Sequence, residues 1–261
     1  MPSQLGSIFL LLKMMNRIKK THESLVICPV YNEEETIEEF YRNLREHYMQ
    51  DVVFVDDGST DSSRRYLASV ESPETFLITH PERLGYGAAL LSGFRFSLER
   101  GYRKIITIDV DLQHNPREIP AFLNALDRER VVLGSRYISS CDHFNIPGER
   151  LAINRYISGL IKRLYAVHFT DPFCGYRGYR ESILKRMVLK QKSYGLGLEI
   201  ILEIIRTGVS FKEIPIKAIY NNHLRKFLDG LDDPKTRLLY YLEILSAKRE
   251  FCYPLTGDGK E

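Results

Sequence analysis

The chain has 261 residues, of which 44% are hydrophobic and 27% charged, so it is long enough for one well-buried core and its body is not expected to be disordered. Its net charge of +3, from 37 basic and 34 acidic residues, is too small to predict a nucleic-acid-binding protein. The 4 cysteines are widely and irregularly spaced, which predicts neither a zinc site nor a disulfide framework and favours free thiols in a reducing compartment.

The N-terminal region carries an apolar run at 8–12. This run is much shorter than the roughly 20 residues that cross a bilayer, and the positive charges follow it instead of preceding it as in a signal peptide. We treat residues 1–23 as an N-terminal extension, in which Met14 and Met15 are alternative start sites. Since no later stretch is long and apolar enough to predict a transmembrane helix, we expect a cytoplasmic protein, either soluble or resting on the cytoplasmic face of a membrane.

Apolar, β-branched runs alternate with amphipathic segments through the first half of the chain. Asn32 is expected to cap the first helix, and Pro116 to start the last helix of this half. The alternation predicts an α/β protein with a mostly parallel sheet and helices on both of its faces. The predicted strands are 24–30, 51–55, 75–79, 104–108 and 130–133, and the predicted helices are 33–47, a segment from 61, 85–100 and a segment from 116.

The second half has a less regular pattern. Helices are predicted at 151–169, 195–206 and 234–248, a strand at 211–219, and a polar loop at 221–233. No internal repeat or linker is visible. We therefore expect one domain over 24–220, with the loop and helix of 221–261 packed on it.

Polar clusters follow the ends of four predicted strands, although they are far apart in the sequence. They are Tyr31-Asn32-Glu33, Asp56-Asp57, the segment 109–113 and Ser135-Arg136. Ligands of open α/β sheets bind at the carboxyl ends of the strands. These segments are therefore expected to converge on one cleft.

The strongest candidate site is the pair Asp109 and Asp111, followed by Gln113. Two carboxylates one residue apart, just past a buried strand, can share a hard cation such as Mg²⁺ or Mn²⁺, which also binds substrate phosphates. Such an ion neutralises charge that develops on a departing diphosphate. The alternative is a helix cap followed by a solvated acid.

Three other motifs have a binding interpretation and a structural one. Asp57 could accept hydrogen bonds from a base or a ribose, or could simply end a strand in a turn. Tyr31 could stack on a base, or could pack against the following helix. Gly85 and Gly87 could let backbone N–H groups approach a phosphate. The chain has neither a G-x-G-x-x-G fingerprint nor a P-loop, which argues against a dehydrogenase and an NTPase.

Six segments occur in a fixed order: VICPVYNEEETI, VVFVDDGSTDSS, RLGYGAALLSGF, IITIDVDLQHNP, VVLGSRY and DPFCGYRGYR. As a set they resemble the family 2 glycosyltransferases with a GT-A fold, over residues 24–180 and more loosely to 219. Within that family they look closest to the dolichyl-phosphate mannosyltransferase and polyprenyl-phosphate glycosyltransferase branch. The resemblance implies a Rossmann-like GT-A nucleotide-diphospho-sugar transferase fold. It also implies an inverting, metal-dependent hexosyltransferase that takes a sugar, first of all mannose from GDP-mannose, to a polyprenyl- or dolichyl-phosphate acceptor.

The resemblance assigns roles to residues of this chain. It implies that Mg²⁺ or Mn²⁺ is held by Asp109, Asp111 and Gln113, and that Arg136 faces a phosphate. With Asp111 and Arg136, Asp171 is expected in the catalytic set. The residues expected to bind the donor are Pro29, Tyr31, Glu33, Val55, Asp57, Arg83, Asp109 and Val110.

The acceptor decides which chemistry is needed. A phosphomonoester is already anionic near neutral pH, so it needs cations and no base. Candidate cations are Arg150, Arg155, Arg177, Arg225 and Lys226, any of which could instead be a solvated surface charge. A hydroxyl acceptor would need a general base, for which Asp171 is the candidate, although it could also be a turn residue. The helix at 151–169 resembles an element that rests on the membrane near a lipid acceptor.

The chain departs from the branch in two segments. It has Phe173-Cys174-Gly175-Tyr176-Arg177 where the branch often reads T-S-G-F-R, and its late loop lacks the usual G-E-S-K-like stretch. One alternative is therefore a glycosyltransferase with a soluble, protein or polysaccharide hydroxyl acceptor. Others are a non-catalytic nucleotide-sugar-binding protein and a nucleotidyltransferase, the latter weakened by the lack of a Gly-rich, Lys-containing loop after Val30.

Overall fold

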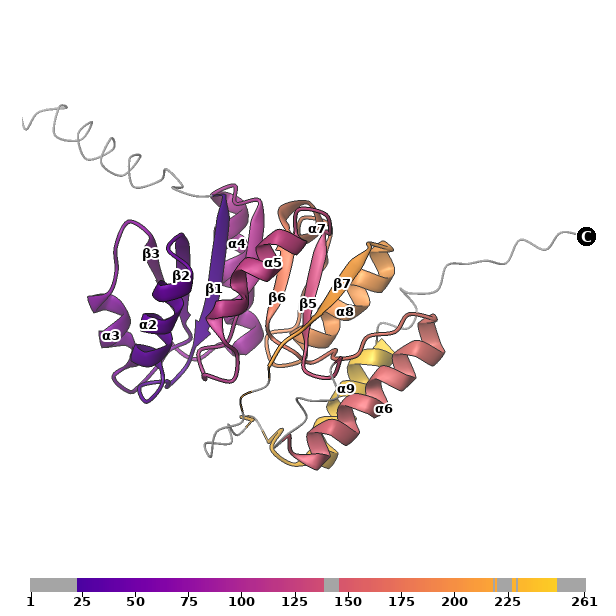
Figure 1. The fold of residues 1–261 in the computed structure, drawn as a ribbon. Coiled ribbons are helices and arrows are strands. Elements are labelled where there is room, and N and C mark those ends of the chain that lie inside the picture. Colours follow the sequence, from indigo (N-terminus) through magenta and orange to yellow (C-terminus); the bar gives the residue numbers. More distant parts are fainter. Residues whose placement is uncertain (1–22, 139–145, 218, 220–226, 229, 248–261) are drawn as a thin grey trace, which may run out of the picture.

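The structure is a computed structural model that describes residues 23–138, 146–217, 219, 227–228 and 230–247. Within these residues the chain forms a seven-stranded sheet and the helices that cover it (Figure 1). In chain order the elements are β1 (Ser24–Val30), α2 (Ile37–His47), β2 (Asp51–Asp56), α3 (Ser63–Ser69), β3 (Thr75–Thr79), α4 (Tyr86–Glu99), β4 (Lys104–Thr107), a 3₁₀ turn η1 (Pro116–Glu118), α5 (Ile119–Ala125), β5 (Val131–Ser135), α6 (Gly148–Tyr165), β6 (Arg177–Arg180), α7 (Glu181–Leu184), α8 (Leu196–Thr207), β7 (Phe211–Pro215) and α9 (Pro234–Ala247).

The strand order in the sheet is β3-β2-β1-β4-β6-β5-β7. β1 pairs in parallel with β2 and β4, β2 with β3, and β5 with β7. β6 is antiparallel to both of its neighbours, β4 and β5. The predicted mostly parallel α/β architecture is therefore confirmed.

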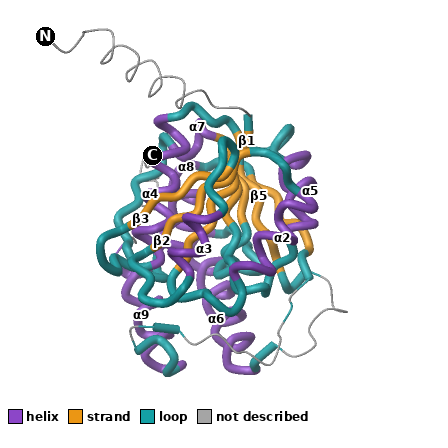
Figure 2. Tube along the Cα trace, turned by 90° about the vertical axis from the view of Figure 1, so that its left-hand side faces the viewer, coloured by secondary structure: helices purple, strands orange, loops and turns teal. Residues whose placement is uncertain are grey.

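The two faces of the sheet are covered by different helices, as the edge-on view shows (Figure 2). Alternate residues of β1 point to opposite sides: Leu25 and Ile27 pack with α4 and α8, while Val26 and Cys28 pack with α2 and α5. Because both faces are buried, the strand is apolar from Leu25 to Val30, which made it recognisable as a continuous apolar run.

Helices α6 and α9 lie next to each other beyond the edge at which the parallel strands end (Figure 1). Arg237 of α9 is buried and donates from Nη2 to the Glu149 carboxylate of α6 at 2.6 Å. Tyr241 of α9 stacks on Phe173, with ring centroids 4.3 Å apart. Helix α9 thus forms one wall of the space next to the carboxyl ends of the strands.

Several local predictions were wrong. The helix predicted at 151–169 spans Gly148–Tyr165, and the strand predicted at 211–219 ends at Pro215. The first helix begins at Ile37 and not at 33, and Asn32 does not cap it: Asn32 has a φ of 52°, and its side chain accepts a hydrogen bond from Thr60 N at 2.8 Å. This contact between two turns takes the place of the expected helix cap. Asn32 can make it because Asn tolerates the left-handed region of backbone conformation. Strand β6 was not predicted, because its sequence RGYR has two arginines and no apolar alternation.

Candidate active site

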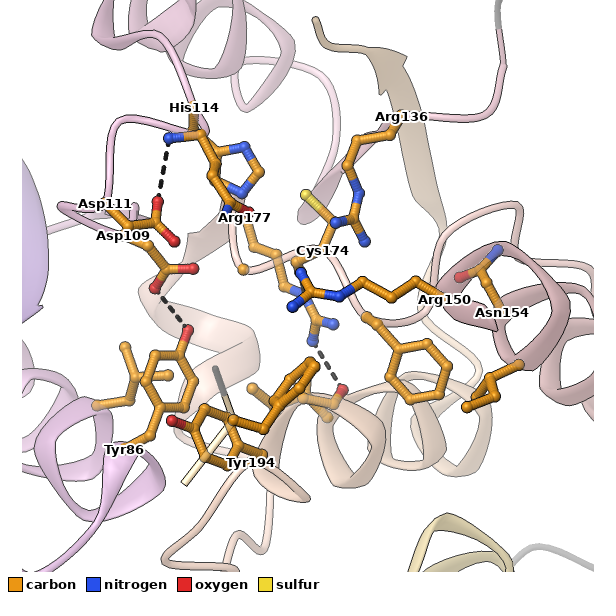
Figure 3. A pocket seen from close by; sticks show the side chains of 18 of the residues that line it. Tyr86, Asp109, Asp111, His114, Arg136, Arg150, Asn154, Cys174, Arg177 and Tyr194 are labelled. Carbon is orange, nitrogen blue, oxygen red and sulfur yellow. Dashed lines mark hydrogen bonds between the residues drawn. The ribbon is translucent and has the colours of Figure 1, made fainter. Parts of the chain in front are cut away.

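Two recesses lie at the edge where the parallel strands end, and they share the side chains of Tyr86 and Tyr194 as a common wall. The larger recess is bordered by the β4 end, α6, α8 and α9. Its walls include Asp109, Asp111, Gln113, His114, Arg136, Arg150, Asn154, Phe173, Cys174, Gly175, Arg177, Phe227, Arg237 and Tyr241. Figure 3 shows the carboxylates of Asp109 and Asp111 on one side and the guanidinium groups of Arg136 and Arg150 on the other. A ligand bound between them would meet acidic groups at one end and basic groups at the other.

The two carboxylates follow β4 directly and are held by different contacts. Asp109 accepts a hydrogen bond from the Tyr86 hydroxyl at 2.9 Å, and Asp111 accepts one from Gln113 N at 3.1 Å. Both carboxylates and the Gln113 side chain line the same recess. The structure therefore brings together the three residues that the sequence singled out for a metal.

The oxygens of Asp109, Asp111 and Gln113 have the chemistry of a divalent-cation site. A Cβ atom at Gly175 would lie 2.5 Å from Asp109 Oδ2 and 2.9 Å from the Tyr86 hydroxyl, so only glycine lets these two oxygens lie where they do. Carboxylate and amide oxygens are the ligands that Mg²⁺ and Mn²⁺ prefer. Among the described residues, no three His, Cys, Asp or Glu side chains are grouped as a metal cage. A cation here would therefore need oxygens from substrate or water, as Mg²⁺ commonly does.

Arg136 and Asp171 form a tightly bonded pair. Arg136 donates from Nε to Asp171 Oδ2 at 2.7 Å, from Nη2 to Oδ1 at 2.9 Å, and from its backbone N to Oδ2 at 3.2 Å. The Asp171 side chain is fully buried, whereas that of Arg136 is 12% exposed. Because both carboxylate oxygens are directed at Arg136, the geometry favours a role for Asp171 in holding this arginine in place over the role of a general base.

The backbone at Asp171 is in turn held by a residue of strand β7. Glu213 of β7 accepts hydrogen bonds from the backbone N–H groups of Thr170, at 2.8 Å, and Asp171, at 3.3 Å. Burial raises the pKa of Glu213 above its ordinary 4.5. The position of the Arg136 guanidinium thus depends on strand β7, which is remote in the sequence.

Two more predicted cations line the larger recess. Arg177 is buried, and its guanidinium donates to the backbone carbonyls of Pro172, Cys174 and Gly197, at 2.7, 2.6 and 2.8 Å. Arg150 comes from the first turn of α6, and its guanidinium lies 4.8 Å from the centre of the Phe227 ring. With Arg237, four arginines line the recess. Arg136 donates to the Asp171 carboxylate and Arg237 to that of Glu149, and Arg150 Nε lies 3.9 Å from Glu149 Oε1.

His114 and Cys174 also line this recess, and neither is charged near neutral pH. Burial lowers the pKa of His114 from 6.5, so the ring is neutral, and its Nδ1 has no hydrogen-bond partner among the described residues. Burial raises the pKa of the Cys174 thiol to about 12, which makes it a poor nucleophile. Neither group supplies charge to the recess.

The smaller recess collects four of the residues expected at the nucleotide. Pro29, Tyr31, Asp57 and Arg83 line it, and the Arg83 guanidinium lies 5.1 Å from the centre of the Tyr31 ring. A flat ring and a planar cation form a surface on which a base can stack. Leu228, from the segment before α9, also lines this recess.

Asp57 is largely engaged by the protein. It accepts hydrogen bonds from His80 Nδ1 at 2.7 Å, Leu84 N at 2.9 Å and Gly85 N at 2.7 Å. A carboxylate has about four lone-pair sites, so little capacity is left for a ligand. Asp57 therefore shapes the recess by fixing the loop that begins α4.

The remaining predicted residues lie elsewhere. Val55 and Val110 are fully buried in the two halves of the core, and Glu33 is nearly buried beside Thr36; these three line neither recess. Arg225 and Lys226 lie outside the described residues.

Gly85 and Gly87 have a structural task. Cβ atoms there would lie 2.4 Å from Lys192 O and 2.5 Å from Gln191 O, and Ala88 N donates to Lys192 O at 2.9 Å. The glycines thus admit the segment that carries Tyr194, and the N–H groups of Gly85 and Ala88 donate to protein groups.

Sequence reasoning missed several lining residues. Asn154 lies four residues after Arg150, a spacing that puts both on one helix face and could have revealed it. Tyr194, Phe227 and Arg237 come from loops and helices with no recognisable motif, so no signal pointed to them.

A family model described as glycosyl transferase family 2 matches residues 25–188. An undecaprenyl-phosphate mannosyltransferase from Micrococcus luteus is 31% identical over 201 residues, which cover 75% of this chain and 83% of that protein. A polyprenol monophosphomannose synthase from Mycolicibacterium smegmatis is 30% identical over 207 residues, covering 76% of this chain and 78% of the relative.

A solved structure of glucosyl-3-phosphoglycerate synthase from Mycobacterium tuberculosis, in complex with Mn²⁺, UDP and phosphoglyceric acid, superimposes with a TM-score of 0.68. Its sequence identity is 16%, and the match covers 92% of this chain and 82% of that one. At this identity the likeness establishes a shared fold.

Proposed function

The chain belongs to glycosyltransferase family 2, and on this premise we propose that it transfers a sugar from a nucleoside-diphosphate donor to a polyprenyl- or dolichyl-phosphate-type acceptor. The chain is a glycosyltransferase with a GT-A fold, as the resemblance implied. The observation that carries the proposal is the pair of adjoining recesses, one lined by Tyr31 and Arg83, the other carrying carboxylates opposite arginines.

The donor would lie across both recesses. Its base would stack against Tyr31 and Arg83 in the smaller one, and its diphosphate would reach Asp109 and Asp111 past the shared wall of Tyr86 and Tyr194. Mannose is the first candidate for the sugar, because the relatives from Micrococcus luteus and Mycolicibacterium smegmatis are named for mannose transfer. UDP-linked glucose and N-acetylglucosamine are the next candidates.

Asp109, Asp111 and Gln113 would hold Mg²⁺ or Mn²⁺. When bound, such an ion neutralises the charge of the departing diphosphate. The groups around it have separate tasks: the Tyr86 hydroxyl and the Gln113 backbone N–H orient the two carboxylates, and the absence of a side chain at Gly175 admits the Asp109 carboxylate to its position.

A phosphate acceptor suits the arginine side of the larger recess. Its oxygen would form a bond to the anomeric carbon as the bond from that carbon to the diphosphate breaks, which inverts the anomeric centre. Arg136, Arg150 and Arg177 would hold the acceptor anion, and no proton has to be removed from it. The pairing of Asp171 with Arg136 favours this acceptor over a hydroxyl, which would need a general base.

Contact with a membrane surface would bring a lipid acceptor to the pocket. In the described ranges, no helix is long and apolar enough to span a membrane. Helix α6, which supplies Arg150 to the pocket, exposes Arg155, Tyr156, Lys162 and Arg163 on its outer side. Basic and aromatic side chains on one helix face suit an anionic lipid surface.

The test is transfer itself. Purified protein is incubated with radiolabelled GDP-mannose, UDP-glucose or UDP-N-acetylglucosamine, with polyprenyl phosphate in liposomes, and with Mn²⁺ or EDTA. We expect the label of one donor to move into the organic phase only when Mn²⁺ and the lipid phosphate are both present. Donor turnover that leaves all label in the aqueous phase would refute a lipid acceptor, and no turnover with any donor would refute the proposed donors.

A further inference from the structure

Tyr86 is the one residue of the α4 start that touches both recesses and one of the two acidic side chains. Its ring lines the nucleotide recess and the larger recess, and its hydroxyl donates to Asp109 Oδ1 at 2.9 Å (Figure 3). No catalytic or binding role follows for Tyr86 from the motifs in the sequence. Its contacts place it between the recess proposed for the nucleotide and the recess proposed for the cation.

The ring of Tyr86 is fixed from the nucleotide side. Asp57 binds the backbone N–H groups of Leu84 and Gly85, the two residues just before it, at 2.9 and 2.7 Å. The Tyr86 ring is stacked on Tyr194, with centroids 5.5 Å apart and planes 12° from parallel. The direction of the hydroxyl is therefore set by the same loop that borders the base.

The carboxylate of Asp109 is oriented from the other side. Oδ1 is bonded to Tyr86, and Oδ2 lies against Gly175, 2.5 Å from the point at which a Cβ atom would stand, so the carboxylate is confined between these two residues. The backbone of Gly175 is held in turn by the Thr107 hydroxyl, which donates to its carbonyl at 2.8 Å. The orientation of the Asp109 carboxylate thus depends on Tyr86, and outer contacts of this kind tune the metal affinity of other sites.

From these contacts we infer that Tyr86 is a positioning residue that couples nucleotide binding to divalent-cation binding at Asp109. The inference rests on the proposed function, because it assumes a nucleoside diphosphate in the smaller recess and a cation beside Asp109. A bound base keeps Tyr86 on Tyr194, and Tyr86 keeps Asp109 turned toward the cation. By linkage, the cation must then tighten the nucleotide by the same factor.

The Tyr86→Phe variant tests this directly, because it removes the hydroxyl and keeps the stacked ring. Dissociation constants of GDP and of UDP are measured by calorimetry in EDTA and in saturating Mn²⁺, and their ratio is the coupling. We expect the ratio to fall by about 10-fold or more in Tyr86→Phe, since such an outer contact is worth about 10- to 100-fold in metal affinity and, on this inference, acts in the nucleotide-bound protein. The dissociation constants in EDTA should stay within about 2-fold of wild type, because the variant leaves the base recess intact.

Tyr66→Phe is the matched control, because Tyr66 lies on α3 and lines neither of the two recesses. Its ratio should equal that of wild type. A Tyr86→Phe ratio equal to wild type, in a protein that binds nucleotide and transfers sugar, would overturn the inference and leave the proposed function standing. If wild-type protein bound neither GDP nor UDP with Mn²⁺, the proposed function itself would fail.

Discussion

Replacing Asp171 by Asn should both lower the stability of the protein and displace the Arg136 guanidinium. The substitution removes a fully buried charge that accepts three hydrogen bonds from Arg136, at 2.7, 2.9 and 3.2 Å. Breaking a buried pair by removing one partner costs about 3–5 kcal/mol. Arg136 is 12% exposed and can be hydrated from the pocket, and Asn keeps one acceptor, so we expect a smaller loss of about 2–3 kcal/mol.

That loss corresponds to a melting temperature lower by about 4–12 °C, measured by circular dichroism. Transfer should fall by about 100-fold, because a displaced guanidinium no longer meets the reacting phosphate. Asp127→Asn is the control: it removes a pair with Lys104 in which the aspartate side chain is 58% exposed, and little change is expected. Asp171→Asn with wild-type stability and wild-type transfer would refute the positioning role, whereas lost transfer at unchanged stability would restore the general-base role.

Three further variants test other parts of the site. Asp111→Asn should reduce Mn²⁺-dependent transfer by about 100-fold or more at an unchanged melting temperature, and full activity would remove Asp111 from the metal site. Gly175→Ala would place a methyl group 2.5 Å from Asp109 Oδ2 and displace the carboxylate, so calorimetry should show Mn²⁺ binding weakened by about 10-fold; wild-type affinity would contradict this role of Gly175. Because the pKa of Glu213 is raised above 4.5 by burial, the folded chain holds this proton more tightly than the unfolded chain does, and the free energy of unfolding in urea should fall as pH rises from 4.5 through the raised pKa. Glu213→Gln should lack this decline, and an equal decline in the variant would contradict it.

Much of the fold could be predicted because the strands of the first half are buried on both faces. Ser24–Val30 and Thr75–Thr79 were predicted with the bounds that the structure has. β6 could not be predicted, because Arg177–Arg180 becomes a strand only through its pairing with β4 and β5. The helix start at Ile37 was missed because a contact between Asn32 and Thr60 competes with the local capping pattern.

In the site, too, the residues next to strand ends could be predicted, whereas those placed by long-range packing could not. Asp109, Asp111, Gln113 and Arg136 come directly after strands, and the structure brings all four to one pocket. The wall formed by Tyr194, Phe227, Arg237 and Tyr241 depends on how α8 and α9 pack, which no local motif encodes. The engagement of Asp57 and Asp171 by protein groups was likewise invisible, because it depends on partners such as His80, Leu84 N and Arg136.

The most direct test of the central claim compares polyprenyl phosphate with the polyprenol of the same chain length as acceptors, using the active donor and Mn²⁺. We predict transfer to the phosphate alone, with the sugar recovered as a phosphodiester whose anomeric configuration is inverted relative to the donor. Transfer to the free polyprenol at a comparable rate would contradict it, because the arginines of the larger recess would then not be holding an acceptor phosphate.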